Sequence, residues 1–136
     1  MPRIRYLTAN QIVDVHDTVL REFGGEDGIL WRGTIDLIAD TPGRKVYGLE
    51  PFRELNDKAA ALFHEIIKLH PFVDGNKRTA STSVEIFLEM NGASIDAEKD
   101  EKLKIALKTG ECKTNVRELA AWFEERLFIA ERFEPD

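Results

Sequence analysis

Apolar residues recur at helical spacing along most of this chain, and this pattern limits the fold more than any other feature of the sequence. The first segment shows it most clearly, with apolar side chains three and four residues apart on one face: Ile12, Val15, Val19, Leu20 and Phe23. Thr8 and Gln11 fit a capping box at its start, and Gly24 fits its end. The pattern therefore predicts a helix over residues 8–23.

Five further segments combine helical spacing with helix start and stop residues, over about residues 30–39, 53–69, 76–91, 96–108 and 114–127. Asp96 and Thr114 are the predicted N-caps of the last two. Residues 43–51 are irregular or extended, and Val46-Tyr47 before Gly48 indicates a short strand or hairpin. We predict an all-α fold, a compact six-helix bundle with a short extended flap, as one domain over residues 1–133. Residues 134–136 are the predicted disordered tail.

Composition excludes several classes of protein. A length of 136 residues fits one domain, and a net charge of −6 argues against nucleic-acid binding, which draws its affinity from Lys and Arg. The single cysteine, Cys112, has no partner for an internal disulfide, which favours a reducing compartment. The first residues do not resemble a signal peptide, and no apolar run is long enough to span a bilayer. We expect a soluble, cytoplasmic protein with no membrane or nucleic-acid partner.

The candidate functional residues lie in one loop between the third and fourth predicted helices, whose sequence is His-Pro-Phe-Val-Asp-Gly-Asn-Lys-Arg over residues 70–78. It places a candidate base, His70, and a candidate magnesium ligand, Asp74, before a helix that begins near Asn76. Free backbone N–H groups and the positive end of the helix dipole make such a helix start an anion site. A nucleotide phosphate is the expected occupant.

Each of these residues also has a simpler interpretation. His70 fits a packed or helix-terminal residue, Asp74 a turn residue and Asn76 a plain helix cap. Lys77 and Arg78 fit a solvated helix face. His16, within the apolar stripe of the first helix, is interpreted as a buried and hydrogen-bonded structural histidine, and His64 is given no role. The two tryptophans are expected to be packing residues: Trp31 and Trp122.

At this point the sequence resembles the Fic/Doc family, whose motif is usually written H-P-F-x-D/E-G-N-G/K-R. The resemblance to the death-on-curing (Doc) branch extends to the Gly24-Gly25-Glu26-Asp27-Gly28-Ile29 segment, to Lys58-Ala59-Ala60 and to Asn91-Gly92. The family transfers AMP or a phosphoryl group from a nucleotide to a hydroxyl of a target protein. The implied cofactors are Mg²⁺ and a nucleoside triphosphate, with ATP expected.

The resemblance assigns a role to each residue of the loop. His70 is the implied general base, and Asp74 is the implied Mg²⁺ ligand. The implied phosphate-binding residues are Gly75, Asn76, Lys77 and Arg78. Asn76 would orient a phosphate, and Arg78 would neutralise the terminal phosphates. Val46 and Tyr47 lie where the family places its target-docking flap.

The motif is a hybrid of two patterns. Doc phosphotransferases usually have Ala at the position of Gly75 and no proline at that of Pro71, whereas AMP-transferring members usually have Gly at the position of Lys77. We favour phosphoryl transfer, on the expectation that Lys77 fills the space that a glycine leaves open. AMP transfer and a non-catalytic module that binds nucleotide or a partner remain alternatives. The chain has no inhibitory motif of its own, so we expect a toxin with a small antitoxin partner. The resemblance suggests elongation factor Tu as the target.

Overall fold

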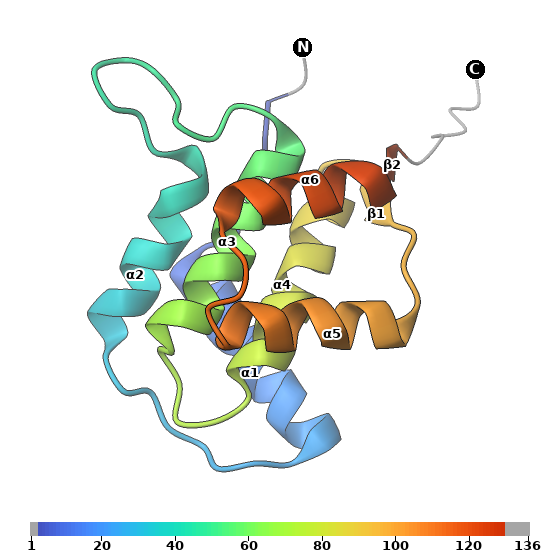
Figure 1. Cartoon of the computed structure of the whole chain (residues 1–136). Coiled ribbons are helices and arrows are strands. Elements are labelled where there is room, and N and C mark those ends of the chain that lie inside the picture. The colour runs from blue at the N-terminus through green and yellow to red at the C-terminus, as the bar shows by residue number, and fades with distance from the viewer. Residues whose placement is uncertain (1–2, 130–136) are drawn as a thin grey trace, which may run out of the picture.

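Six α-helices make up most of the described part of the chain, residues 3–129, in the computed structural model (Figure 1). They are α1 (Ala9–Phe23), α2 (Arg32–Asp40), α3 (Leu55–Leu69), α4 (Asn76–Met90), α5 (Lys99–Gly110) and α6 (Val116–Arg126). A short 3₁₀ turn, η1 (Thr41–Gly43), follows α2. The all-α prediction is confirmed. The predicted tail, residues 134–136, lies outside the described residues.

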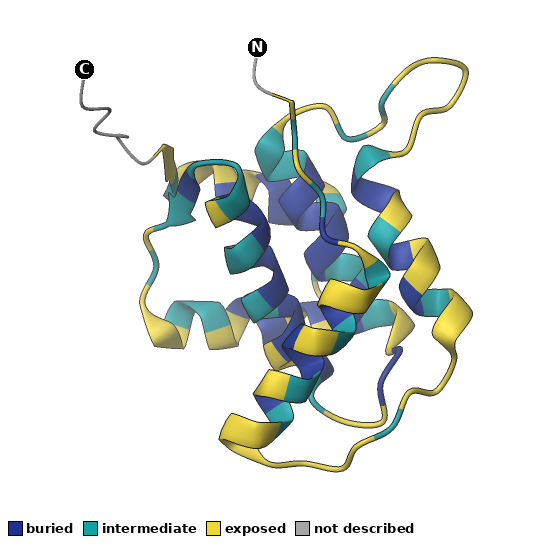
Figure 2. Ribbon diagram, turned by 180° about the vertical axis from the view of Figure 1, so that it is seen from behind, coloured by how far each residue is buried: buried dark blue, intermediate teal, exposed yellow. Residues whose placement is uncertain are grey.

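Helix α3 lies at the centre of the fold and packs against α2, α4, α5 and α6 (Figure 1). Three consecutive alanines in its first half are buried, Ala59, Ala60 and Ala61, and small side chains allow neighbouring helices to approach closely. Its second half buries larger groups, Phe63, Ile66 and Ile67. The buried sides of all the helices face this centre, and their exposed sides face outward (Figure 2). No helix among residues 3–129 is long and apolar enough to cross a membrane.

Capping decides where two of the helices begin. The Thr8–Gln11 capping box at α1 is confirmed: Gln11 N–H donates to Thr8 Oγ1 at 3.1 Å, and Thr8 N–H donates to Gln11 Oε1 at 2.8 Å. The N-cap prediction for α6 was one residue early, because the Asn115 side chain, rather than Thr114, accepts from Glu118 N–H at 2.9 Å. For α5 the Asp96 prediction was wrong, since α5 begins two residues later, after Glu98.

Two strands, β1 (Ala93–Ile95) and β2 (Leu127–Ile129), pair antiparallel and were not predicted. Leu127 lies opposite Ile95 in this pair, so it belongs to β2 and not, as predicted, to the apolar face of α6. Trp122 is a packing residue, as predicted: it is partly buried against the core and meets the Phe123 ring edge-on at 5.2 Å. The strands join the end of α6 to the end of α4.

Residues 46–49 form the predicted hairpin. Val46 and Leu49 exchange two backbone hydrogen bonds, of 2.8 and 3.0 Å, across a turn in which Tyr47 and Gly48 both have positive φ. The buried Lys58 ammonium holds the surrounding segment by donating to the carbonyl oxygens of Pro42 (3.0 Å) and Phe52 (2.6 Å) and to Glu50 (3.2 Å). The hairpin therefore has a fixed base beside the start of α3.

Candidate active site

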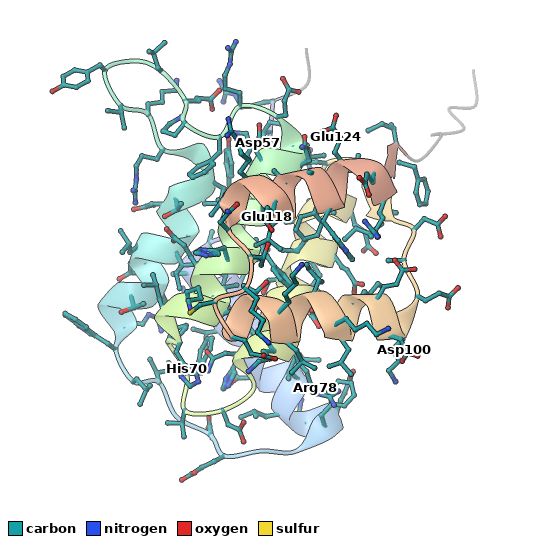
Figure 3. The ribbon with its side chains drawn as sticks, viewed as in Figure 1. Asp57, His70, Arg78, Asp100, Glu118 and Glu124 are labelled. Carbon is teal, nitrogen blue, oxygen red and sulfur yellow. The ribbon has the colours of Figure 1, made fainter. Side chains whose placement is uncertain are left out.

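The motif loop, residues 70–75, connects the end of α3 to the start of α4 (Figure 3). His70 is the C-cap of α3 and has left-handed backbone angles, φ 52° and ψ 60°. Residues other than glycine seldom adopt this conformation, and it is found mainly where the surrounding structure enforces it. The His70 imidazole is exposed beside the loop, which suits a group that must reach a substrate.

Phe72 and Asn76 build the loop from within. Phe72 is fully buried and stacks on the His16 ring, with the ring centroids 3.8 Å apart. The Asn76 side chain accepts from Phe72 N–H at 3.1 Å and donates to Phe72 C=O at 2.9 Å. Asn76 is 4% exposed, so its side chain holds the loop and is not open to a ligand on the outer side of the loop. What it can offer to an anion is its backbone N–H.

A strap formed by residues 24–31 lies along one side of the motif loop. Leu30 N–H donates to Pro71 C=O at 2.8 Å, and Val73 N–H donates to Gly28 C=O at 2.9 Å, as in a short antiparallel pair. Gly28 has φ +149°, and a Cβ there would lie 2.7 Å from Val73 Cγ2. At Gly25 a Cβ would lie 2.9 Å from Asp74 Oδ2. These close approaches explain two of the glycines in the segment that resembles the Doc branch.

Asp74 has a structural role that the turn interpretation anticipated. Its Oδ1 accepts from Gly75 N–H at 2.9 Å, and its Oδ2 accepts from Glu26 N–H at 3.2 Å. A carboxylate oxygen has two lone pairs, so each oxygen retains one that could face a cation. Mg²⁺ often binds one carboxylate and completes its shell with water and substrate phosphates, so the exposed Asp74 fits such a site.

The start of α4 presents an anion site. Gly75 is its N-cap, with φ 80° and ψ 14°, and within residues 3–129 no side chain caps the helix there. The first N–H groups of a helix have no partner inside the helix, and the dipole of a 15-residue helix adds positive potential at this end. No hydrogen-bond acceptor among residues 3–129 takes the backbone N–H groups of Asn76, Lys77 and Arg78, which leaves them available to an anion.

The two motif cations lie against different helices, α1 and α5. The Arg78 guanidinium lies over the Phe23 ring at the end of α1, 3.8 Å from its centroid. Lys77 extends toward the last turn of α5, where a Cβ on Gly110 would meet Lys77 Cε at 2.9 Å. The structure thus places the Lys77 side chain against the last turn of α5. That its stem also fills the space at the anion site stays a prediction.

The hairpin does not lie near these residues. It precedes α3, whereas His70 follows it, and a helix of 15 residues is about 22 Å long. Figure 1 shows the hairpin segment at one end of α3 and the motif loop at the other. Val46 and Tyr47, the predicted target-docking flap, therefore lie at the other end of α3 from His70, and their docking role stays a prediction. The extended segment beside the motif loop is the strap.

The sequence predicted packing roles for His16 on α1 and for Trp31 on the strap, and the structure confirms only the first. His16 is buried and hydrogen-bonded, as predicted, and its Nε2 lies 2.7 Å from the Asp74 carbonyl oxygen. Trp31 is 73% exposed, so its prediction as a packing residue was wrong. A strap that contacts the loop through its backbone leaves such side chains on the outside. Sequence reasoning missed both the strap and the contact of His16 with the motif.

A helix that ends in an exposed histidine, followed by a loop that opens the next helix with free amides, defines a helix-terminus site for an anion such as a phosphate. A sequence model of the Fic/DOC family matches residues 6–88, which include α1, the strap, α3 and the motif loop. The chain belongs to the Fic/DOC family.

Two relatives lie in the Doc branch. The chain is 38% identical over 94 residues to "Toxin Doc" of Mycolicibacterium smegmatis, covering 66% of this chain and 72% of that protein. It is 28% identical over 110 residues to "Protein kinase doc" of Escherichia phage P1, covering 79% of this chain and 86% of that protein. Both alignments support the Doc branch over most of the fold described above.

Proposed function

We propose that this protein is a Doc-like toxin of a toxin–antitoxin pair, a transferase that uses Mg²⁺ and a nucleoside triphosphate to phosphorylate a hydroxyl of a target protein. One observation carries the catalytic part: the exposed His70 and the free amides of α4 lie at the two ends of the same six-residue loop. The toxin and kinase parts are supported by the names of the two relatives. Phosphoryl transfer requires a phosphate held in position beside a base that accepts the proton of the hydroxyl.

In this proposal the target hydroxyl attacks the γ-phosphorus of ATP. A new oxygen–phosphorus bond forms, the bond to the β-phosphate oxygen breaks and ADP leaves. A ring nitrogen of His70 takes the hydroxyl proton. The amides of α4 and the Arg78 guanidinium hold the phosphates in position. Asp74 would hold Mg²⁺, which supplies positive charge to the phosphate oxygens.

The strap is the proposed docking surface for the target. Three consecutive side chains on it are apolar and exposed: Ile29 (40%), Leu30 (62%) and Trp31 (73%). They are placed beside the motif by the backbone pairing of the strap with residues 71–73. Exposed apolar side chains grouped next to a reactive site are typical of a protein-binding surface. Elongation factor Tu is the target that we propose on family grounds, with the cytoplasm as the place of action.

The alternative reaction is AMP transfer. The Lys77 side chain lies against Gly110 in the last turn of α5, and this contact favours neither reaction. Support for phosphoryl transfer therefore rests on the likeness to a relative named as a protein kinase. A non-catalytic binding module is the third candidate.

Labelled ATP separates the three candidates. Purified protein is incubated with Mg²⁺, elongation factor Tu and either γ- or α-labelled ATP, and the intact mass of the target is measured. A label from γ-ATP only, with a gain of about 80 Da, supports the kinase. A label from α-ATP supports AMP transfer, and bound nucleotide without any label supports a binding module.

A further inference from the structure

His16 contacts the motif loop from inside the fold at Phe72 and at Asp74, and its ring also lies beside Gly75. Its ring stacks on Phe72 with an interplanar angle of 5°, and its Nε2 lies 2.7 Å from the Asp74 carbonyl oxygen. A Cβ on Gly75 would lie 3.6 Å from His16 Cδ2. His16 itself is 1% exposed, so a nucleotide or target bound on the outer side of the loop does not touch it.

The hydrogen bond fixes the direction of one peptide group. A carbonyl oxygen only accepts, so the proton of this bond is on His16 Nε2. In a trans peptide the C=O and N–H groups point to opposite sides. Because the Asp74 C=O points inward to His16, the Gly75 N–H points outward, where it donates to Asp74 Oδ1 at 2.9 Å. The same peptide thus orients the carboxylate that we propose as the metal ligand.

Little else holds this peptide in place. Within residues 3–129 the bond from His16 is the only hydrogen bond that the Asp74 carbonyl accepts. The contact from the strap, Glu26 N–H, reaches the Asp74 side chain and not its backbone. Gly75 has φ 80°, and glycine adopts the opposite sign of φ about as readily. Without His16, among the hydrogen bonds of residues 3–129, a rotation of the Asp74–Gly75 peptide by half a turn would break only the one from Gly75 N–H to Asp74 Oδ1.

We propose that His16 is a positioning residue, which holds the Asp74–Gly75 peptide with its N–H and the Asp74 carboxylate on the outer, phosphate-binding side of the loop. This inference rests on the proposed function for its effect on rate. The geometric part, the orientation of one peptide by one buried imidazole, stands without it. Groups that orient a metal ligand from behind typically change activity or metal affinity about 10- to 100-fold when replaced.

Two variants separate the hydrogen bond from the ring stacking. His16→Phe keeps a flat ring on Phe72 but has no donor, whereas His16→Gln places an amide donor near the position of Nε2 and loses the stacking. Val19→Ala is the control, because Val19 is buried on the same helix and faces Gly75 but has no polar contact with the loop. Each variant is measured for thermal stability, kcat, KM for ATP and the Mg²⁺ concentration that gives half the maximal rate.

We expect His16→Phe to lower kcat about 10- to 100-fold and to raise the Mg²⁺ requirement, and His16→Gln to recover most of both. Val19→Ala should lose stability and retain kcat. A folded Phe variant with the kcat and Mg²⁺ requirement of the wild type would overturn the proposal. So would a folded Gln variant that is no better than Phe.

Nuclear magnetic resonance tests the geometry without any activity. In ¹⁵N-labelled wild type the His16 imidazole should carry its proton on Nε2, and a proton on Nδ1 alone would overturn the proposal even if neither variant folds. The Gly75 amide signal should move more in His16→Phe than in His16→Gln. If the wild type transfers nothing to any target, the proposed function fails, and these spectra still decide the role of His16.

Discussion

Residues of the motif loop divide into those that build the loop and those whose side chains are free to react. Phe72 and Asn76 are buried and bind each other, so their replacement should damage the loop itself. His70 is exposed and holds a backbone conformation that costs free energy. Asp74 belongs to both groups, since it binds two backbone amides and remains exposed.

Replacement of His70 should separate activity from stability. His70→Ala and His70→Gly should both abolish transfer and leave nucleotide binding largely intact, because the base is lost and the amides of α4 remain. At φ 52° glycine carries no Cβ penalty, so the Gly variant should be more stable than the Ala variant by about 1 kcal/mol. Denaturant unfolding and calorimetric ATP binding measure these two properties. Near-normal transfer by either folded variant would show that His70 is not the base.

Two replacements of Asp74 should separate its structural role in the turn from its proposed binding of Mg²⁺. Asp74→Asn keeps an oxygen that can accept one backbone N–H, whereas Asp74→Ala keeps none. We expect Asn to retain most of the stability and to lose the enhancement of ATP binding by Mg²⁺, and Ala to lose both. Calorimetry with and without Mg²⁺ measures the enhancement. If Asp74→Asn binds ATP with the full effect of Mg²⁺, Asp74 is only a turn residue.

Among the elements, the strap is unusual because it has no regular structure of its own and yet determines the shape of the site. It joins α1 to α2 and pairs with residues 71–73 through two backbone hydrogen bonds. Gly25 and Gly28 allow it to lie close to the motif loop, since a Cβ at either position would lie under 3.0 Å from a side chain of the loop. The strap and the motif loop should therefore move, or lose order, together.

Gly28→Ala tests this coupling, and Gly24→Ala is its matched control on the same strap. Both positions have positive φ, but a Cβ on Gly28 would lie 2.7 Å from Val73 Cγ2, whereas a Cβ on Gly24 would meet nothing within 4 Å. Each variant should lose about 1 kcal/mol to backbone strain, and only Gly28→Ala should also displace the loop and lower transfer. Unfolding and transfer rates check this. Equal rates in the two variants would show that the strap does not control the site.

The sequence predicted the parts of this fold that depend on neighbouring residues. The Thr8 capping box, the hairpin turn at Tyr47-Gly48 and the loop between α3 and α4 all follow from local spacing. The β1–β2 pair did not, because each strand has three residues and its partner lies more than thirty positions away. The direction of Lys77 and the place of the hairpin depend on how helices distant in sequence pack. No local pattern specifies either of them.

On the scale of the whole molecule, α3 is both the centre of the core and the support of the site. Its first turn carries Lys58, which holds the hairpin segment, and its last residue leads into His70. Between them Glu65 is partly buried on the same helix. A partly buried carboxyl on the central helix links the stability of the entire fold to pH.

Burial raises the pKa of the Glu65 carboxyl above its ordinary value of 4.5, although the neighbouring Thr41 hydroxyl and the charge of Arg44 act in the opposite direction. The folded state therefore holds this proton more tightly than the unfolded chain. Its stabilising effect is complete below the unfolded pKa and is lost as the pH rises through the folded pKa. Glu65→Gln should thus gain thermal stability relative to the wild type as the pH rises above 4.5. The exposed Glu124→Gln is the control, and an identical pH dependence of Tm for wild type and Glu65→Gln would contradict this.

Expression in a bacterial host tests the proposed toxin as a whole. Without its antitoxin the wild type should arrest growth, and His70→Ala should relieve the arrest while accumulating to the same level. The expected antitoxin is a segment that folds as a helix on binding. Harmless expression of a folded wild type that still transfers phosphate in vitro would count against the toxin role.

The contacts of α1 and the strap with the motif loop also have a genetic consequence. Because α1 and the strap both hold the loop, single substitutions outside the motif should also remove the toxic activity. Survivors selected from a mutagenised population should carry changes at Gly25, Gly28 and His16 as well as at His70. Substitutions at Gly25, Gly28 and His16 should be temperature-sensitive, with no toxicity in warm cells and restored toxicity after cooling. They destabilise the conformation of the loop but leave every reacting group in place.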